Sequence, residues 1–286
     1  MIKHFKYLLQ SLIIYFFFLL GRLMGLKNSQ KIFSFIFKNL GPKFKSTKII
    51  YENLSIFNPS MTFDEKKEIS QQMWSNYGKT FIEYIFLDKY KNKKNFTNLE
   101  GEYILDEVLK IKKPTIFISG HFANFEMMSM QITKKNINLA TIYRPLNNYF
   151  LNPFMEFLRR KYICKNQIRK GRSGVREAIE YIGRGYSIAL MIDQRVSEGE
   201  TVNLFNQPAL TTTLPAQLAL KFNLNVVPVF IEREKDDSFK IKFYSPIDSS
   251  KFKNKFEFTK YLNARLEEMI TKNPGQWIWS HSRWKL

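Results

Sequence analysis

Short apolar runs typical of buried β-strands alternate with helical patterns from Pro114 onward, and this alternation constrains the fold more than any other feature of the chain. Strands that alternate with helices indicate an α/β fold, with a mixed, largely parallel sheet flanked by helices. Ligands on such sheets bind at the carboxyl ends of the strands. The predicted strands are Thr115–Ser119, Leu139–Tyr143, Ser187–Ile192, Val226–Ile231 and Phe239–Phe243, and the predicted helices are Asn124–Lys134, Phe150–Tyr162, Ser173–Arg184, Leu214–Phe222 and Phe256–Thr271.

The part of the chain before Pro114 is predicted to be mainly helical. Residues 62–88 have a helical apolar pattern, and Thr62 and Glu65 have the spacing of a capping box. The polar, lysine-rich and asparagine-rich stretch from Lys89 to Asn98 is predicted to be a loop. An aromatic segment at residues 33–37 is either an interfacial segment or an ordinary amphipathic helix.

Tyr7 to Leu26 is strongly apolar, and a bilayer span needs roughly 20 such residues. We therefore expect residues 1–26 to anchor the chain in a membrane and residues 27–286 to form the catalytic domain. A buried core helix is the alternative. A signal peptide is disfavoured because no alanine precedes Ala123, so an A-x-A cleavage site is missing. Basic residues flank the segment and place the body on the cytoplasmic side: Lys3, Lys6, Arg22, Lys27, Lys31, Lys38, Lys43 and Lys45.

The formal net charge of +20 favours an anionic partner, which the charge alone does not specify: the phosphates of nucleic acid, anionic lipid headgroups or an acidic protein. Nucleic acid is disfavoured because neither a zinc finger nor an RNP-like aromatic signature is present. The only cysteine is Cys164, which excludes an internal disulfide, and three histidines with one cysteine make a metal site improbable. We expect neither a metal nor a cofactor.

His121 and Glu126 lie in the segment Gly-His-Phe-Ala-Asn-Phe-Glu, directly after a predicted buried strand. On one continuous helix the two side chains would be roughly 140° apart. If His121 instead lies in the loop before the helix, Glu126 can reach back to its ring. A carboxylate on one ring nitrogen lets the other take a proton from a hydroxyl. Physical reasoning alone leaves a packed histidine with a helix-capping glutamate equally open.

This His-x4-Glu segment resembles the glycerolipid acyltransferase superfamily and, more closely, the lipid A late acyltransferases, because further motifs follow in the order of that family. Tyr143-Arg144-Pro145 follows a strand, and Arg169-Lys170-Gly171-Arg172-Ser173-Gly174 precedes a helix. The remaining motifs are Asp193-Gln194, Val227-Pro228-Val229 and the closing segment from Trp277 to Trp284. Leu204-Phe205-Asn206 and Ser282 depart from the pattern of the family and leave the substrate details open.

The resemblance implies a catalytic pair, His121 and Glu126, and a set of substrate-binding residues: Gly120, Asn124, Arg144, Arg169, Arg172, Gly174 and Asp193. Gly120 would let a bulky substrate approach the backbone. Arg144 is placed to meet a substrate phosphate or a thioester carbonyl. The Arg169–Gly174 loop, at a helix N-terminus, has the chemistry of an anion site, and a solvated basic turn is the alternative. For Asp193 the alternative is a strand-end cap.

The expected reaction is transfer of a fatty acyl chain from an acyl thioester, on acyl carrier protein or coenzyme A, to a hydroxyl of a phosphorylated glycolipid. That glycolipid would be a precursor of lipid A, and the enzyme would lie at the inner membrane with its catalytic domain on the cytoplasmic side. A Gly-x-Ser-x-Gly elbow is absent, which favours direct transfer without an acyl-enzyme. The alternatives are a lysophospholipid or another glycolipid as acceptor, or a non-catalytic basic protein that binds membranes.

Overall fold

The protein is described by a computed structural model that covers residues 2–44, 47–92 and 96–286. The helices are α1 (Ile2–Met24), α2 (Leu26–Phe44), α3 (Thr47–Phe57), α4 (Phe63–Glu83), η1 (Tyr84–Phe86), α5 (Leu87–Asn92), α6 (Glu102–Ile111), α7 (Glu126–Lys134), α8 (Asn152–Tyr162), α9 (Arg172–Gly183), α10 (Leu214–Phe222), η3 (Ser249–Lys251), α11 (Lys255–Lys272) and η4 (Pro274–Gln276). The strands are β1 (Thr97–Glu100), β2 (Ile116–Ser119), β3 (Leu139–Tyr143), β4 (Asn166–Arg169), β5 (Ser187–Met191), β6 (Glu200–Leu204), β7 (Gln207–Thr211), β8 (Asn225–Arg233), β9 (Phe239–Phe243) and β10 (Ile247–Asp248).

One sheet of eight strands organises the body, in the order β1-β9-β8-β2-β5-β3-β4, with β10 beside β8. The pairings of β8 with β9 and with β10 are antiparallel, and all other neighbours in this sheet are parallel. The predicted α/β class with a mixed, largely parallel sheet is confirmed. β6 and β7 form a separate antiparallel hairpin.

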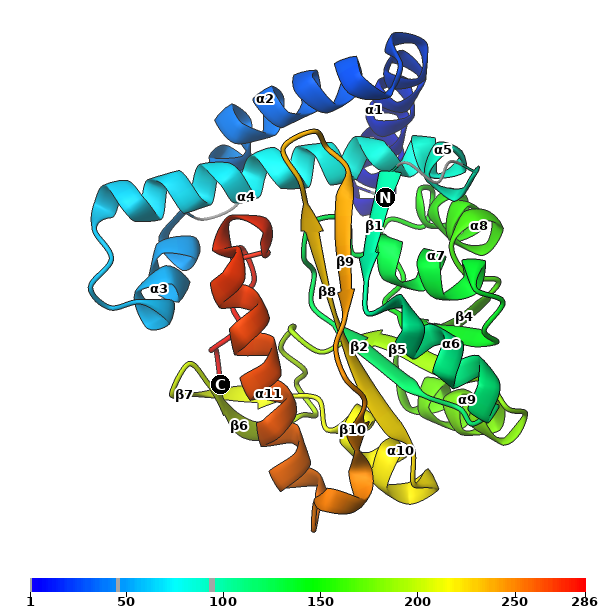
Figure 1. Ribbon diagram of the computed structural model, residues 1–286. Helices are drawn as coiled ribbons and strands as arrows, with labels where there is room; N and C mark the ends of the chain where they lie inside the picture. Colours follow the sequence, from blue (N-terminus) through cyan, green and yellow to red (C-terminus); the bar gives the residue numbers. More distant parts are fainter. Residues whose placement is uncertain (1, 45–46, 93–95) are drawn as a thin grey trace.

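Helices cover the sheet on both faces, and the N-terminal helices lie across one end of it (Figure 1). In this view α11 lies on one side of the sheet and α6, α7, α8 and α9 on the other. α4 crosses the upper end, where the long β8–β9 hairpin reaches it, and α2 packs along α4. The chain between β5 and β8 returns through the β6–β7 hairpin and α10.

The carboxyl ends of β2, β3, β4 and β5 meet at one edge of the sheet, because these four strands are parallel neighbours. Ser119 at the end of β2 pairs with Met191 at the end of β5, and Tyr143 of β3 pairs with Arg169 of β4. The residues that follow these strands therefore converge, as expected for a ligand site on a parallel sheet.

The predicted helix over residues 62–88 is confirmed at its start and divided at its end. Thr62 and Glu65 form the expected capping box, in which the Thr62 amide donates to Glu65 Oε2 at 2.7 Å. α4 ends at Glu83, and the turn η1 and the helix α5 follow. The predicted loop was wrong at its ends, because α5 reaches Asn92 and β1 begins at Thr97, while residues 93–95 lie outside the described residues.

α1 contains the predicted anchor, and within the described residues it is the helix long and apolar enough to cross a membrane. Only one narrow face of it packs on the body, through Ser11, Phe18 and Gly21. The alternative of a buried core helix is therefore wrong. The outward face exposes large apolar side chains: Ile2, Phe5, Leu8, Leu9, Leu12, Ile13, Phe16, Leu19 and Leu23. The aromatic segment at residues 33–37 is part of α2, which packs on α4.

Candidate active site

His121 lies in the loop between β2 and α7, at the carboxyl edge of the sheet. β2 is fully buried, and Ser119 at its end donates to the Val229 carbonyl at 2.6 Å, which fixes the point where the loop begins. Gly120 is also buried. A side chain there would meet Phe122 at 2.7 Å and Leu266 at 3.2 Å, so packing requires the glycine. We expected Gly120 to admit the substrate, but the space beside it is filled by these two side chains.

The carboxylate that holds the His121 ring is Asp193, which follows β5. His121 Nδ1 lies 2.8 Å from Asp193 Oδ1, and the His121 backbone amide donates to Asp193 Oδ2, also at 2.8 Å. The Trp277 indole donates to the same Oδ2 at 2.8 Å. Because Nδ1 donates its hydrogen to Asp193, Nε2 is the ring nitrogen that can accept a proton.

Asp193 is ionised in this setting although it is buried. Burial raises the pKa of the Asp193 carboxyl, but the His121 charge, the two hydrogen bonds from His121 and the one from Trp277 outweigh burial and lower the pKa from 3.8 to about 2. A buried carboxylate of this kind orients an imidazole and stabilises the imidazolium that forms when Nε2 takes a proton.

Glu126 is the first residue of α7 and takes part in a different cluster. Its Oε1 accepts from Tyr84 Oη at 2.6 Å and from Arg159 Nε at 2.7 Å. Over the part of the chain that the structure describes, no hydrogen bond or ion pair joins Glu126 to His121. The contact that we expected is therefore made by Asp193 instead.

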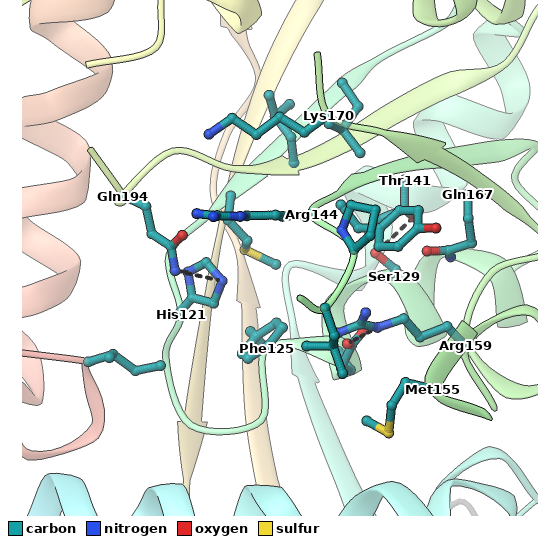
Figure 2. A pocket seen from close by; sticks show the side chains of 18 of the residues that line it. His121, Phe125, Ser129, Thr141, Arg144, Met155, Arg159, Gln167, Lys170 and Gln194 are labelled. Atoms are coloured by element: carbon teal, nitrogen blue, oxygen red, sulfur yellow. Dashed lines mark hydrogen bonds and ion pairs between the residues drawn. The ribbon is translucent and has the colours of Figure 1, made fainter. Parts of the chain in front are cut away.

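The geometry of the loop explains this difference. Ala123 has a positive φ of 43°, so the chain turns sharply before α7 begins. The Phe125 ring packs on the His121 ring with centroids 4.5 Å apart. Figure 2 shows Phe125 between His121 and Arg159, the partner of Glu126.

A cavity of about 540 Å³ borders His121, Glu126 and Arg159. Apolar side chains from seven parts of the chain contribute to its wall: Phe18, Tyr77, Phe81, Phe125, Leu151, Met155, Leu190, Leu214 and Ile278. The Gln194 amide nitrogen lies 3.4 Å from His121 Nε2 and 3.1 Å from His281 Nε2, at the polar end of the cavity. The cavity can hold an apolar chain beside a group that accepts a proton.

Of the three basic residues that we expected to bind substrate, Arg144 lines this cavity, whereas Arg169 and Arg172 are not among its described lining residues. Lys170, which was not in the predicted set, lines it as well (Figure 2). Burial lowers the pKa of Lys170, and the nearby charge of Arg144 lowers it further. This mutual repulsion would be relieved by an anion. Arg169 instead points to Glu156, at 3.3 Å, with two thirds of its side chain exposed.

Arg172 and Gly174 line a smaller hollow of about 190 Å³ at the N-terminus of α9, which Lys170 also borders. Gly174 is required by packing, since a side chain there would lie 2.0 Å from the Arg169 carbonyl oxygen. Asn124 is buried behind the loop and donates to Glu83 Oε2 at 2.8 Å. It does not appear among the described residues that line the large cavity.

Sequence reasoning missed Arg159 and Tyr84, and it gave no role to the individual tryptophans of the closing segment. Arg159 lies on the face of α8 that also carries the buried Met155. A charged residue on the apolar face of a predicted amphipathic helix was the signal that could have found it. Trp277 is buried, and its indole hydrogen bond to Asp193 makes it part of the site.

The model of a protein family, the bacterial lipid A biosynthesis acyltransferases, matches residues 1–286. The chain is 23% identical over 263 residues to a lipid A biosynthesis acyltransferase of Haemophilus influenzae, which covers 88% of this chain and 82% of the relative. It is 21% identical over 248 residues to a lipid A biosynthesis lauroyltransferase of Escherichia coli, covering 84% and 79%. Among solved structures it is similar to the 1-acyl-sn-glycerophosphate acyltransferase PlsC of Thermotoga maritima, with 13% identity, a TM-score of 0.41, and 95% and 99% of the two chains covered.

The match to the family over the whole chain excludes the alternative of a non-catalytic basic protein, and it implies an acyl donor and an acceptor of the lipid A type. The chain belongs to the bacterial lipid A biosynthesis acyltransferase family and is an O-acyltransferase.

Proposed function

We propose that the enzyme transfers a fatty acyl chain from an acyl thioester to a hydroxyl of a phosphorylated glycolipid, with His121 as the general base. One observation carries the proposal: Nδ1 of His121 is held by the buried Asp193, while the ring borders an apolar cavity. In the reaction the acceptor hydroxyl gives its proton to Nε2 as its oxygen attacks the thioester carbonyl carbon. The carbon–sulfur bond then breaks, and the leaving thiolate takes the proton from the imidazolium.

The roles of the two carboxylates follow from their contacts. Asp193 orients His121, and Glu126 acts at a distance by fixing the first turn of α7 and the Arg159 side chain in the cavity wall. Glu126 is therefore a positioning residue in this proposal. Asn124 contributes in the same way, since it holds the loop and does not border the large cavity.

Arg144 and Lys170 form the anion subsite of the acceptor. Both border the same cavity as His121, and the charge of Arg144 adds to burial in lowering the pKa of Lys170, against the opposing charge of Glu198. A phosphate of the glycolipid supplies a counter-charge. Arg172 and the N-terminus of α9 line the adjoining hollow and extend the subsite, whereas Arg169 is engaged by Glu156.

The donor carries its acyl chain on acyl carrier protein or coenzyme A, and both carriers are anionic. The net charge of +20 favours their approach. Neither a metal nor a cofactor takes part in the proposed steps.

The enzyme works at the inner membrane, with its catalytic body on the cytoplasmic side and the exposed face of α1 in the lipid. Polar contacts fix α1 to the body at its middle, through Ser11 to Asn148 at 3.0 Å, and near its C-terminal end, through Arg22 to Asp88 at 2.8 Å. A spanning helix would draw these body residues into the hydrocarbon, which is costly for a charged group. α1 therefore lies within one leaflet, and its Phe18 lines the cavity, so an acyl chain can pass from the lipid to the site.

The experiment is an acyl-transfer assay on the purified protein in detergent with an acyl thioester and three acceptors: a phosphorylated glycolipid, its dephosphorylated form and a lysophospholipid. We expect transfer to the phosphorylated glycolipid and a loss of about 10²–10⁴-fold in His121→Ala. If the enzyme prefers the lysophospholipid, that lipid replaces the phosphorylated glycolipid as the proposed acceptor. Full activity of a folded His121→Ala protein would remove His121 from the mechanism.

A further inference from the structure

The loop that carries His121 has a conformation that its own sequence does not favour. Ala123 adopts a φ of 43°, in the left-handed region that an alanine rarely occupies. Contacts from outside the loop must therefore hold it. Four hydrogen bonds do so: Ala123 N–H to the Gln276 carbonyl at 2.9 Å, Thr80 Oγ1 to the Ala123 carbonyl at 2.9 Å, Asn76 Nδ2 to the same carbonyl at 3.4 Å, and Asn124 Nδ2 to Glu83 Oε2 at 2.8 Å.

Each of these four hydrogen bonds involves a residue that also binds Arg233, the last residue of β8. Its guanidinium donates to Asn76 Oδ1 at 2.9 Å and to Thr80 Oγ1 at 3.3 Å, and it pairs with both carboxylate oxygens of Glu83. Its backbone N–H donates to Gln276 Oε1 at 2.7 Å, and its carbonyl accepts from Gln276 Nε2 at 2.8 Å.

The ion pair of Arg233 and Glu83 is fully buried, so removing its two charges from water costs free energy. The side chains are 4% and 0% exposed. A buried ion pair of this kind is often no more stabilising than apolar residues of similar volume. Stability alone is therefore a weak reason for a buried pair at this place.

Gln30 of α2 joins the same cluster, because its Nε2 donates to Glu83 Oε1 at 2.6 Å. The cluster thus connects α2, α4, β8 and the catalytic loop. On the other side of the loop, both the ring and the backbone amide of His121 bind Asp193. A shift of the loop would lengthen both of these contacts at once.

We infer that Arg233 and Glu83 are positioning residues for the acyl transfer: they act through Asn76, Thr80, Asn124 and Gln276 to hold His121 against Asp193. The inference rests on the proposed role of His121. Misplacement of a catalytic group by about 1 Å can slow a reaction about 100-fold, which is the scale of effect to expect when this support is lost.

Thr80 offers the sharpest test because it can lose its hydroxyl without losing its shape. Thr80→Val removes the hydrogen bond to the Ala123 carbonyl, and Thr80→Ser keeps it. We expect Thr80→Val to lower kcat about 10-fold or more while the KM for each substrate changes less than about threefold, and Thr80→Ser to retain most of the activity. Equal kcat values in folded Thr80→Val and Thr80→Ser would overturn the inference.

A second test replaces the whole pair by apolar residues in the double variant Glu83→Leu with Arg233→Met. It removes both charges together and so avoids leaving one buried and unpaired. We expect a folded protein with a kcat lowered about 10- to 100-fold. The control is Lys135→Met, which removes ion pairs to Glu102 and Asp106 remote from the loop and should leave kcat unchanged. A folded double variant with normal kcat would overturn the inference.

The two proposals can fail separately. If His121→Ala remains active, the proposed function fails whatever the Thr80 variants do. If His121→Ala is inactive and Thr80→Val is as fast as Thr80→Ser, only the positioning role fails.

Discussion

His121 has two carboxylates within reach of its loop, and the structure distinguishes them by their partners. Asp193 binds His121 and Trp277, whereas Glu126 binds Tyr84 and Arg159. The carboxylate that shares a hydrogen with the imidazole controls its tautomer, and the other controls the shape of the cavity wall. Substitutions at the two positions should therefore affect different kinetic constants.

We predict that Asp193→Asn lowers kcat at least about 100-fold, because the amide can no longer stabilise the imidazolium as a carboxylate does. Glu126→Gln keeps a hydrogen-bond acceptor for Tyr84 and Arg159, so it should lower kcat less and mainly raise the KM for an acyl substrate. Steady-state kinetics of both variants with each substrate varied in turn measures this. The opposite ranking would return the orienting role to Glu126.

The sequence could place His121 at the end of a strand but could not identify its partner. A spacing of five residues is compatible with a contact, and the left-handed turn at Ala123 that prevents it carries no signal in the residue type. Asp193 lies 72 residues from His121 in the chain, so its proximity depends on the pairing of β2 with β5. Such pairings between distant segments depend on the strand order of the whole sheet, which a local sequence pattern does not reveal.

At the scale of elements, the predicted strands that were confirmed are apolar and buried on both faces. β2 and β5 are examples, and all or nearly all of their residues are buried. β4 was missed because it has four residues and the polar sequence Asn-Gln-Ile-Arg. Its place at the edge of the sheet allows that composition. This strand turns Arg169 away from the cavity and brings Lys170 to it.

We predict that Arg144→Met and Lys170→Met each raise the KM for the phosphorylated acceptor about 10-fold, and that donor KM changes little. A charge-assisted contact contributes about 1.5–3 kcal/mol, and about 1.4 kcal/mol corresponds to tenfold. The matched control is Arg169→Met, which removes the same type of charge from the same loop but leaves the cavity intact. The same KM rise with the dephosphorylated acceptor would show that these residues do not bind its phosphate.

At the scale of the whole molecule, the catalytic edge of the sheet faces the N-terminal helices. Phe18 of α1 and Phe81 of α4 line the same cavity as His121, and their rings are 5.1 Å apart. α1, which exposes many large apolar side chains, therefore also borders the cavity that we propose as the substrate site. In the proposed function, this arrangement brings the lipid-facing helix and His121 to the same cavity.

The orientation of α1 gives the last prediction. With 23 residues, α1 is about 34 Å long and could span a bilayer by length alone. Its contacts with Asn148 and Asp88 favour a position within one leaflet, and its two ends then stay on the same side of the membrane. A cysteine at Lys3, in a Cys164→Ser background, should react with a membrane-impermeant maleimide in inverted inner-membrane vesicles but not in intact spheroplasts. A cysteine at the exposed Lys251 of the body is the matched control and should behave in the same way. If the cysteine at Lys3 reacts in spheroplasts while that at Lys251 reacts only in inverted vesicles, α1 spans the bilayer and must leave its contacts on the body.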